Sequence, residues 1–144
     1  MSETKSLQFE TGLVTYRIND TCEVTFNPTD AFFVERLYNH FEALDKKQSE
    51  YEKTVQTMAD KQKILEFMRE RDAEMRAILD DIFGTPMSDA TFGRMNVYAM
   101  ASGLPAWANC LLAVMDECDT AFAREQKATN PRLQKYLAKY QKKR

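Results

Sequence analysis

Apolar residues follow two different periods along this chain. Between residues 6 and 26 they alternate with polar residues, which is typical of strands with one buried face. The alternating positions are Leu7 and Phe9, then Val14, Tyr16 and Ile18, then Cys22, Val24 and Phe26. Asn19 and Asp20 separate the last two runs, and these residue types suit a hairpin turn. We expect an antiparallel hairpin or a three-stranded sheet, with helices covering its apolar face.

After residue 26 the spacing becomes helical. Asn27 is a good N-cap and Pro28 suits a first helical position, so we expect a helix to begin there. Its apolar stripe would consist of Phe33, Leu37, Phe41 and Leu44. Residues 45–63 are mostly charged or polar, and only a thin helical stripe continues through them.

Neither proline nor glycine occurs between residues 29 and 83, which allows either one very long helix or two helices. We favour a break near residues 57–60, because Asp60 is a plausible cap and compact domains rarely contain helices of over fifty residues. The second helix would end at Gly84. Its expected apolar face is Ile64, Met68, Met75, Leu79 and Ile82.

The strongest amphipathic pattern begins at Pro105. There Trp107, Leu111, Val114, Cys118 and Phe122 recur every three or four residues, which predicts a central core helix. A short helix is expected from Ser88 and ends before Gly103, with residues 101–105 as a corner between helices. The expected core is Phe33, Leu37, Phe41, Leu79, Trp107, Leu111, Val114 and Phe122. The predicted fold is therefore α-rich (α+β): a small N-terminal antiparallel sheet followed by four to six helices.

Charge is distributed unevenly over the 144 residues. Residues 124–144 contain eight basic side chains and one acidic side chain, a balance of +7, whereas the rest has 12 basic and 21 acidic, a balance of −9. This division predicts an acidic domain, residues 1–129, followed by a basic segment, residues 130–144. An acidic body with a basic tail indicates a partner for the tail, either another macromolecule or a second copy.

The basic segment also has an apolar stripe. Asn130 and Pro131 again form a capping pair, and Leu133, Tyr136, Leu137 and Tyr140 then fall on one face of the predicted helix. Arg132, Lys135, Lys139 and Lys142 add positive charge. A helix of this length is marginal alone in water and must dock on its own body, on a neighbouring copy or on a partner. We take Leu133, Tyr136, Leu137, Tyr140, Arg132, Lys135 and Lys139 as the candidate partner-binding residues.

Candidate catalytic chemistry is sparse. His40 is the only histidine, and we interpret it as a boundary residue on a packed helix. Cys110 and Cys118 are eight residues apart on one predicted helix, too far to share a metal ion or a disulfide, so we interpret them as buried apolar residues. The acidic runs at residues 79–81 and 115–119 fit solvated helix faces better than a cation site. We expect no enzymatic activity, no metal and no cofactor.

The N-terminus is polar and lacks the apolar region of a secretory signal, and no apolar run is long enough to span a membrane. The odd number of cysteines, three, argues against a disulfide framework. The expected location is therefore the cytoplasm, with reduced thiols and no membrane partner.

Four extended runs resemble proteins encoded in the tail region of prophages and siphophages of Firmicutes, which are similar to tail assembly chaperones. The runs are FNPTDAFFVERLYNHFEALDKKQ, RDAEMRAILDDIFG, MNVYAMASGLPAWANCLLAVMDE and FAREQKATNPRLQKYLAKY. The resemblance covers about residues 23–140 and rests on extended wording rather than a chemical motif. It implies a mostly helical protein without catalytic residues that multimerises and binds the tape-measure protein, or another tail protein, in the host cytoplasm.

Two other functions stay open at this point. Basic residues interleaved with tyrosines suit nucleic acid, although the acidic body would repel it. Small acidic proteins also suit inhibitors of host defence proteins, but no residue here points to that role. We therefore rank a protein partner above nucleic acid.

Overall fold

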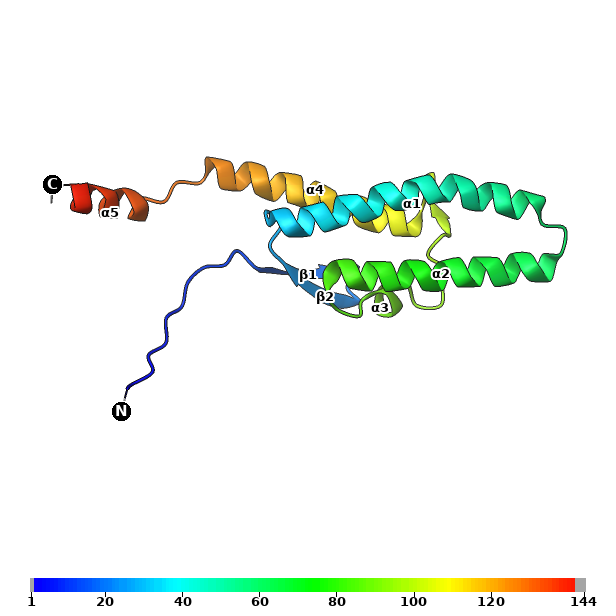
Figure 1. The fold of residues 1–144 in the computed structure, drawn as a ribbon, viewed down its shortest axis with the longest axis horizontal. Helices are drawn as coiled ribbons and strands as arrows, with labels where there is room; N and C mark the ends of the chain where they lie inside the picture. The colour runs from blue at the N-terminus through cyan, green and yellow to red at the C-terminus, as the bar shows by residue number, and fades with distance from the viewer. Residues whose placement is uncertain (1, 142–144) are drawn as a thin grey trace.

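The computed structural model describes residues 2–141 and confirms an α-rich α+β fold (Figure 1). The described part contains a small N-terminal β-hairpin, five helices and one further short strand pair. The elements in chain order are β1 (Val14–Ile18), β2 (Cys22–Phe26), α1 (Ala31–Thr57), α2 (Lys61–Phe83), α3 (Ser88–Phe92), β3 (Met100–Ala101), β4 (Leu104–Pro105), α4 (Ala106–Lys127) and α5 (Arg132–Gln141).

The N-terminal sheet has two strands in the described residues. β1 pairs antiparallel with β2, with Val14 opposite Phe26 and Ile18 opposite Cys22. Asn19 and Asp20 turn the chain with positive φ values of 46° and 58°, as their residue types predicted. Of the two expected arrangements the hairpin is confirmed, and Leu7 and Phe9 add no third strand, because residues 2–13 form no strand and both of these side chains are exposed. Alternation alone does not make a strand without a neighbour to pair with.

The first helix begins three residues later than predicted. Asp30 is its N-cap, and the carboxylate accepts a hydrogen bond of 3.0 Å from the Phe32 backbone N–H. Asn27 instead closes a local turn, where its Oδ1 accepts from the Thr29 N–H at 2.8 Å while its Nδ2 donates to the Thr11 carbonyl. The predicted capping role of Asn27 and Pro28 was therefore wrong, because the Asn27 side chain is engaged in these two contacts.

The predicted break between two helices is confirmed. α1 ends at Thr57, and Asp60 caps α2 by accepting a 2.9 Å hydrogen bond from the Gln62 N–H. Gly84 ends α2 in the left-handed conformation with φ of 68°, the usual role of glycine after a helix. Figure 1 shows α1 and α2 lying side by side as an antiparallel pair, with their connecting turn at one end of the molecule.

The segment between α2 and α4 is less helical than predicted. α3 ends at Phe92, and residues 100–105 form a short hairpin where residues 101–105 were expected to be a corner between helices, since β3 pairs with β4. Ser102 and Gly103 supply the positive φ that this turn needs. Arg76 of α2 holds the segment in place, because its guanidinium donates to the Gly93 and Met95 carbonyls at 2.9 and 2.7 Å.

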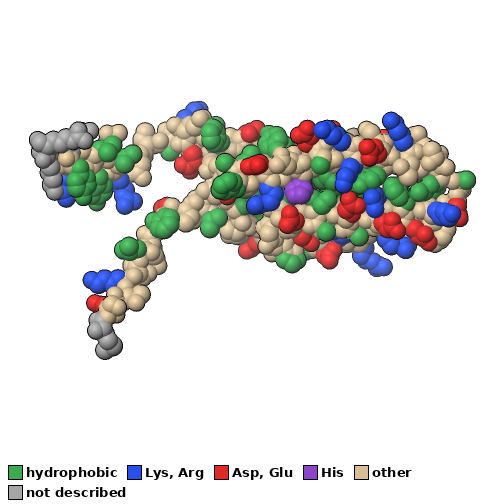
Figure 2. Space-filling view, viewed as in Figure 1, with side chains coloured by type: hydrophobic (Ala, Val, Ile, Leu, Met, Phe, Trp, Pro, Cys, Tyr) green, Lys and Arg blue, Asp and Glu red, His purple; other side chains and the backbone are tan. Residues whose placement is uncertain are grey.

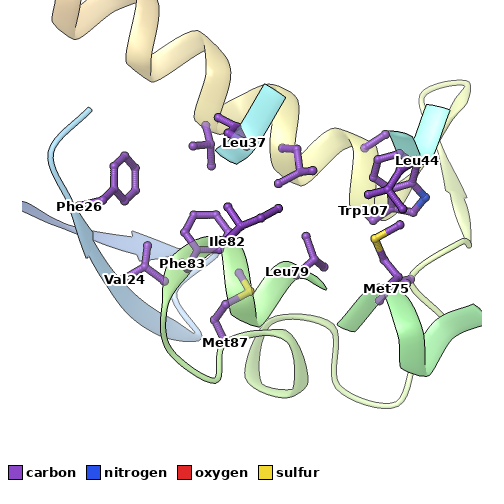
Figure 3. Packing of buried hydrophobic residues seen from close by; sticks show 14 of the residues in the cluster. Val24, Phe26, Leu37, Leu44, Met75, Leu79, Ile82, Phe83, Met87 and Trp107 are labelled. Carbon is purple, nitrogen blue, oxygen red and sulfur yellow. The ribbon is translucent and has the colours of Figure 1, made fainter. Parts of the chain in front are cut away.

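One hydrophobic core joins the hairpin, α1, α2 and α4 (Figure 3). At the hairpin end, the Phe26 and Phe33 rings stack with centroids 4.2 Å apart. In the middle, Leu37, Leu79 and Leu111 are completely buried. The other expected members Trp107 and Val114 are buried as predicted.

Phe122, Phe41 and Met68 depart from the expected burial. Phe122 is 53% exposed, and Ala121 is buried in its place. A helical stripe drifts around its axis, so that the fifth contact falls three residues after Cys118 rather than four. Phe41 is only half-buried, at the edge of the core, and Met68 is exposed in the part of α2 that precedes its first buried residue, Met75.

Candidate functional site

The C-terminal helix α5 forms where its capping pair predicted. The Asn130 side chain accepts a 3.0 Å hydrogen bond from the Arg132 N–H, and the Pro131 carbonyl accepts from the Lys135 N–H at 3.1 Å. These contacts define the first turn of a helix that runs to Gln141. The predicted Lys142 lies outside the described residues.

The apolar face of α5 is exposed. Leu133 is 65% exposed, Tyr136 47%, Leu137 46% and Tyr140 61%, and every residue from 128 to 140 is exposed. Figure 1 shows α5 extending beyond the end of α4, away from the body, and Figure 2 shows hydrophobic side chains gathered on it. The four apolar residues of the predicted binding face therefore share one helix surface that the body does not cover.

The predicted cations lie on the same helix. Arg132, Lys135 and Lys139 are exposed, and the Lys135 ammonium lies 5.9 Å from the centre of the Tyr136 ring. Within its described length α5 has no acidic residue. All seven predicted partner-binding residues thus lie on one exposed, basic and amphipathic helix.

Sequence reasoning missed a cleft between α1 and α2, at the end near their connecting turn. Its volume is about 370 Å³, within the range of about 300–1,000 Å³ typical of binding clefts. The lining residues are Gln48, Tyr51, Glu52, Val55, Gln56, Phe67, Met68, Arg71, Asn96 and Tyr98.

Arg71 is the polar centre of this cleft. Its guanidinium carbon lies 5.0 Å from the centre of the Tyr51 ring and 5.2 Å from that of Phe67, and it pairs with Glu74 at 3.1 Å. The Nε of Arg71 and the Oε1 of Gln48 are buried without a hydrogen-bond partner in the described structure. The cleft therefore combines aromatic walls with one donor and one acceptor that have no hydrogen-bond partner within the described residues.

The cleft lies where the α1–α2 pair extends beyond the hydrophobic core. No residue between Leu44 and Met75 is buried, whereas the other halves of both helices contribute seven buried residues to the core. The first turn of α4 reaches only as far as Trp107, whose ring meets the Tyr98 ring at 6.4 Å. The thin stripe through residues 45–63, with Tyr51 and Val55, was the only sequence signal of a partly covered helix pair.

A second groove of about 510 Å³ lies beside β1, between the hairpin, the α3 region and α4. At its edge, the Tyr16 hydroxyl donates a 2.6 Å hydrogen bond to a carboxylate oxygen of Glu117 on α4. Burial, followed by this hydrogen bond, raises the pKa of Tyr16 to about 12. The contact fixes the hairpin against α4 and leaves the groove with mixed apolar and polar walls.

The histidine, aspartate and cysteine residues considered for catalysis are engaged in contacts within the fold or are at least partly buried. The His40 Nε2 lies 3.6 Å from an Asp81 oxygen at the surface, and an Asp80 oxygen accepts from the backbone N–H groups of Met87 and Ser88. Burial raises the pKa of both Cys110 and Cys118 to about 11, which keeps their thiols protonated at neutral pH.

Residues 2–141 contain neither a metal site nor a membrane-spanning helix. No group of three or more histidine, cysteine, aspartate or glutamate side chains is arranged to hold a metal ion. Among the same residues, no helix combines the length and apolar composition required to cross a membrane.

The fold and site thus define a helical protein that exposes an amphipathic basic helix and has a cleft between α1 and α2. No protein-family model, curated protein or solved structure was found to match the chain.

Proposed function

We propose that this protein is a non-enzymatic assembly protein that binds other protein chains through α5. In its specific form, it is a phage tail assembly chaperone that multimerises and binds the tape-measure protein in the host cytoplasm. The observation that carries the proposal is the exposed stripe of Leu133, Tyr136 and Leu137 on a helix too short to be stable alone.

Two further features support a protein partner. The opposite charges of the body and the tail favour association with an acidic chain. The stripe has the i, i+3, i+4 spacing by which amphipathic helices pack against other helices. Together with the resemblance to phage tail-region proteins, they favour the long hydrophobic helices of a tape-measure protein as the partner.

Co-expression with a tape-measure protein from the same phage tests the proposal. We expect the wild-type chain to keep the tape-measure protein in the soluble fraction, and the double variant Leu133→Ser/Leu137→Ser to lose this activity. The matched control is Gln134→Ser/Ala138→Ser, which makes two serine changes at positions of α5 outside the stripe. If the stripe variant protects as well as wild type does, α5 is not the contact.

Nucleic acid is a second candidate, because exposed Tyr136 and Tyr140 lie on the same helix as three exposed cations. Binding to phosphates weakens steeply with ionic strength, whereas docking of an apolar face does not. A titration with single-stranded DNA at about 50 and 200 mM salt distinguishes the two, since a tenfold or larger loss of affinity would favour nucleic acid.

A further inference from the structure

Resting on the self-association proposed above, we propose that the cleft between α1 and α2 receives α5 of a second copy of this chain. Each copy would then offer its helix to one neighbour and its cleft to another. The contact would be head to tail, with α5 as the donor and the cleft as the acceptor.

The cleft has the surface chemistry that a third helix would complete. Tyr51, Val55 and Met68 supply apolar contacts along two antiparallel helices, as in the grooves that accept amphipathic helices. The buried Gln48 Oε1 needs a donor and the buried Arg71 Nε needs an acceptor. On α5, the hydroxyl of Tyr136 in the stripe can donate or accept, and the neighbouring Lys135 can donate.

The two surfaces also agree in length. Along α1 the cleft runs from Gln48 to Gln56, which corresponds to about 12 Å at 1.5 Å per residue. The apolar stripe of α5 runs from Leu133 to Tyr140, which corresponds to about 10 Å. One α5 helix would therefore cover the cleft from end to end.

Charge favours this occupant. Glu52 lines the cleft and forms no ion pair within residues 2–141. Its carboxylate accepts a 3.4 Å hydrogen bond from the Gln48 side-chain amide. Arg71, the other charged lining residue, is already paired with Glu74 and Glu70. The free negative charge thus meets a helix with Arg132, Lys135 and Lys139 and no acidic residue in its described length.

The helix cannot reach the cleft of its own chain. The cleft adjoins Tyr98 and hence the first turn of α4, while α5 follows its last turn, about 33 Å away along 22 residues. The connection from Lys127 to Arg132 spans at most about 18 Å, and Leu137 lies only about 8 Å further along α5. Figure 1 shows α5 and the α1–α2 turn at opposite ends of the molecule. A second copy must therefore supply the helix.

Such a contact joins two different surfaces, so it can repeat from copy to copy. A heterologous contact of this kind produces a ring if its rotation closes and an open filament if it does not. Association would consequently proceed beyond a dimer as concentration rises.

A mixing experiment with two full-length variants tests this arrangement. The helix variant, Leu133→Ser/Leu137→Ser, keeps the cleft intact but loses the apolar stripe of α5. The cleft variant, Val55→Lys/Met68→Lys, keeps the helix but places two cations in the cleft. By light scattering, we expect wild type to grow in mass with concentration and each variant alone to stay monomeric. An equal mixture should form dimers and stop there, because only one productive contact remains.

The matched control for the cleft variant is Tyr38→Lys/Leu65→Lys. It changes one exposed apolar residue on each of α1 and α2 outside the cleft, and it should associate like wild type. Thermal melts must show that the cleft variant is folded. If it is not, Glu52→Lys alone should weaken association about tenfold at low salt, and Lys135→Glu on the partner copy should restore it.

Three results would overturn the inference: a wild-type chain that stays monomeric, a folded cleft variant that associates normally, or a mixture that stays monomeric. These results are separable from failure of the proposed function, which the tape-measure assay reports. A cleft variant that still protects the tape-measure protein while wild type stays monomeric would refute only the self-contact.

Discussion

α4 and α5 are consecutive amphipathic helices, but the apolar face of α4 is buried and that of α5 is exposed. α4 buries six residues, among them Trp107 and Leu111, against the hairpin and the α1–α2 pair. α5 has an equally regular stripe, yet its residues 132–140 are all exposed. The difference is a matter of position, because α4 runs across the core whereas α5 begins beyond the end of that helix (Figure 1). An apolar stripe thus stabilises the fold only where other elements are within reach, and otherwise it is available for binding.

The largest expected effect on stability comes from removing the Trp107 side chain of α4. Trp107→Ala should lower the free energy of unfolding by about 3–5 kcal/mol, because removal of a large buried ring leaves a cavity. Leu137→Ala on α5 should change it by less than about 0.5 kcal/mol, as exposed substitutions usually do. Urea unfolding of both variants measures the contrast. Equal losses would mean that α5 packs on the body.

A second test concerns the polar anchor of the segment that leads into α4. Arg76→Leu should cost about 2–3 kcal/mol, since it removes hydrogen bonds to the carboxylates of Asp72 and Asp89 and to three backbone carbonyls. The matched control is Arg69→Leu, an exposed arginine of the same helix that forms no recorded ion pair within residues 2–141. Thermal or urea unfolding of the two variants reports the difference, and similar melting would refute the anchoring role.

A smaller effect is expected at alkaline pH, where the hairpin contacts α4. The pKa of Tyr16 is raised in the folded state, so the contribution of this group to stability is complete below about pH 10 and is lost as the pH rises towards 12. Tyr16→Phe should flatten this part of the pH profile, although it loses the hydrogen bond to Glu117. Comparison of the two profiles cancels the contribution of Cys110 and Cys118, which titrate in both proteins. Parallel profiles would contradict the prediction.

The smallest effect on stability should come from deletion of residues 131–144. The body should unfold at nearly the same denaturant concentration, because the buried residues of the described chain all precede residue 122. Its mass should fall to that of a monomer even at concentrations where the full chain associates. A large loss of stability together with an unchanged mass would show that α5 belongs to the fold.

Local features of the fold followed from the sequence because their causes are local. Asp60 and Asn130 cap the helices that follow them, and Gly84 ends α2, since each of these effects depends on a few adjacent residues. The Asn19–Asp20 turn and the stripe from Trp107 to Cys118 were predicted for the same reason. The candidate residues on α5 were also found from spacing alone, and their role in binding stays a prediction.

Tertiary structure decided whatever depends on distant neighbours. Residues 7–9 alternate like a strand but have no strand beside them, and Asn27 turns towards Thr11 instead of capping a helix. Phe122 is exposed because the stripe drifts and the core ends at Ala121. The cleft could not be foreseen because it arises where α4 stops short of a longer helix pair. The sequence by itself determined the long helices and which of their faces are apolar, while the packing determined which of those faces are covered, because burial requires a partner in space.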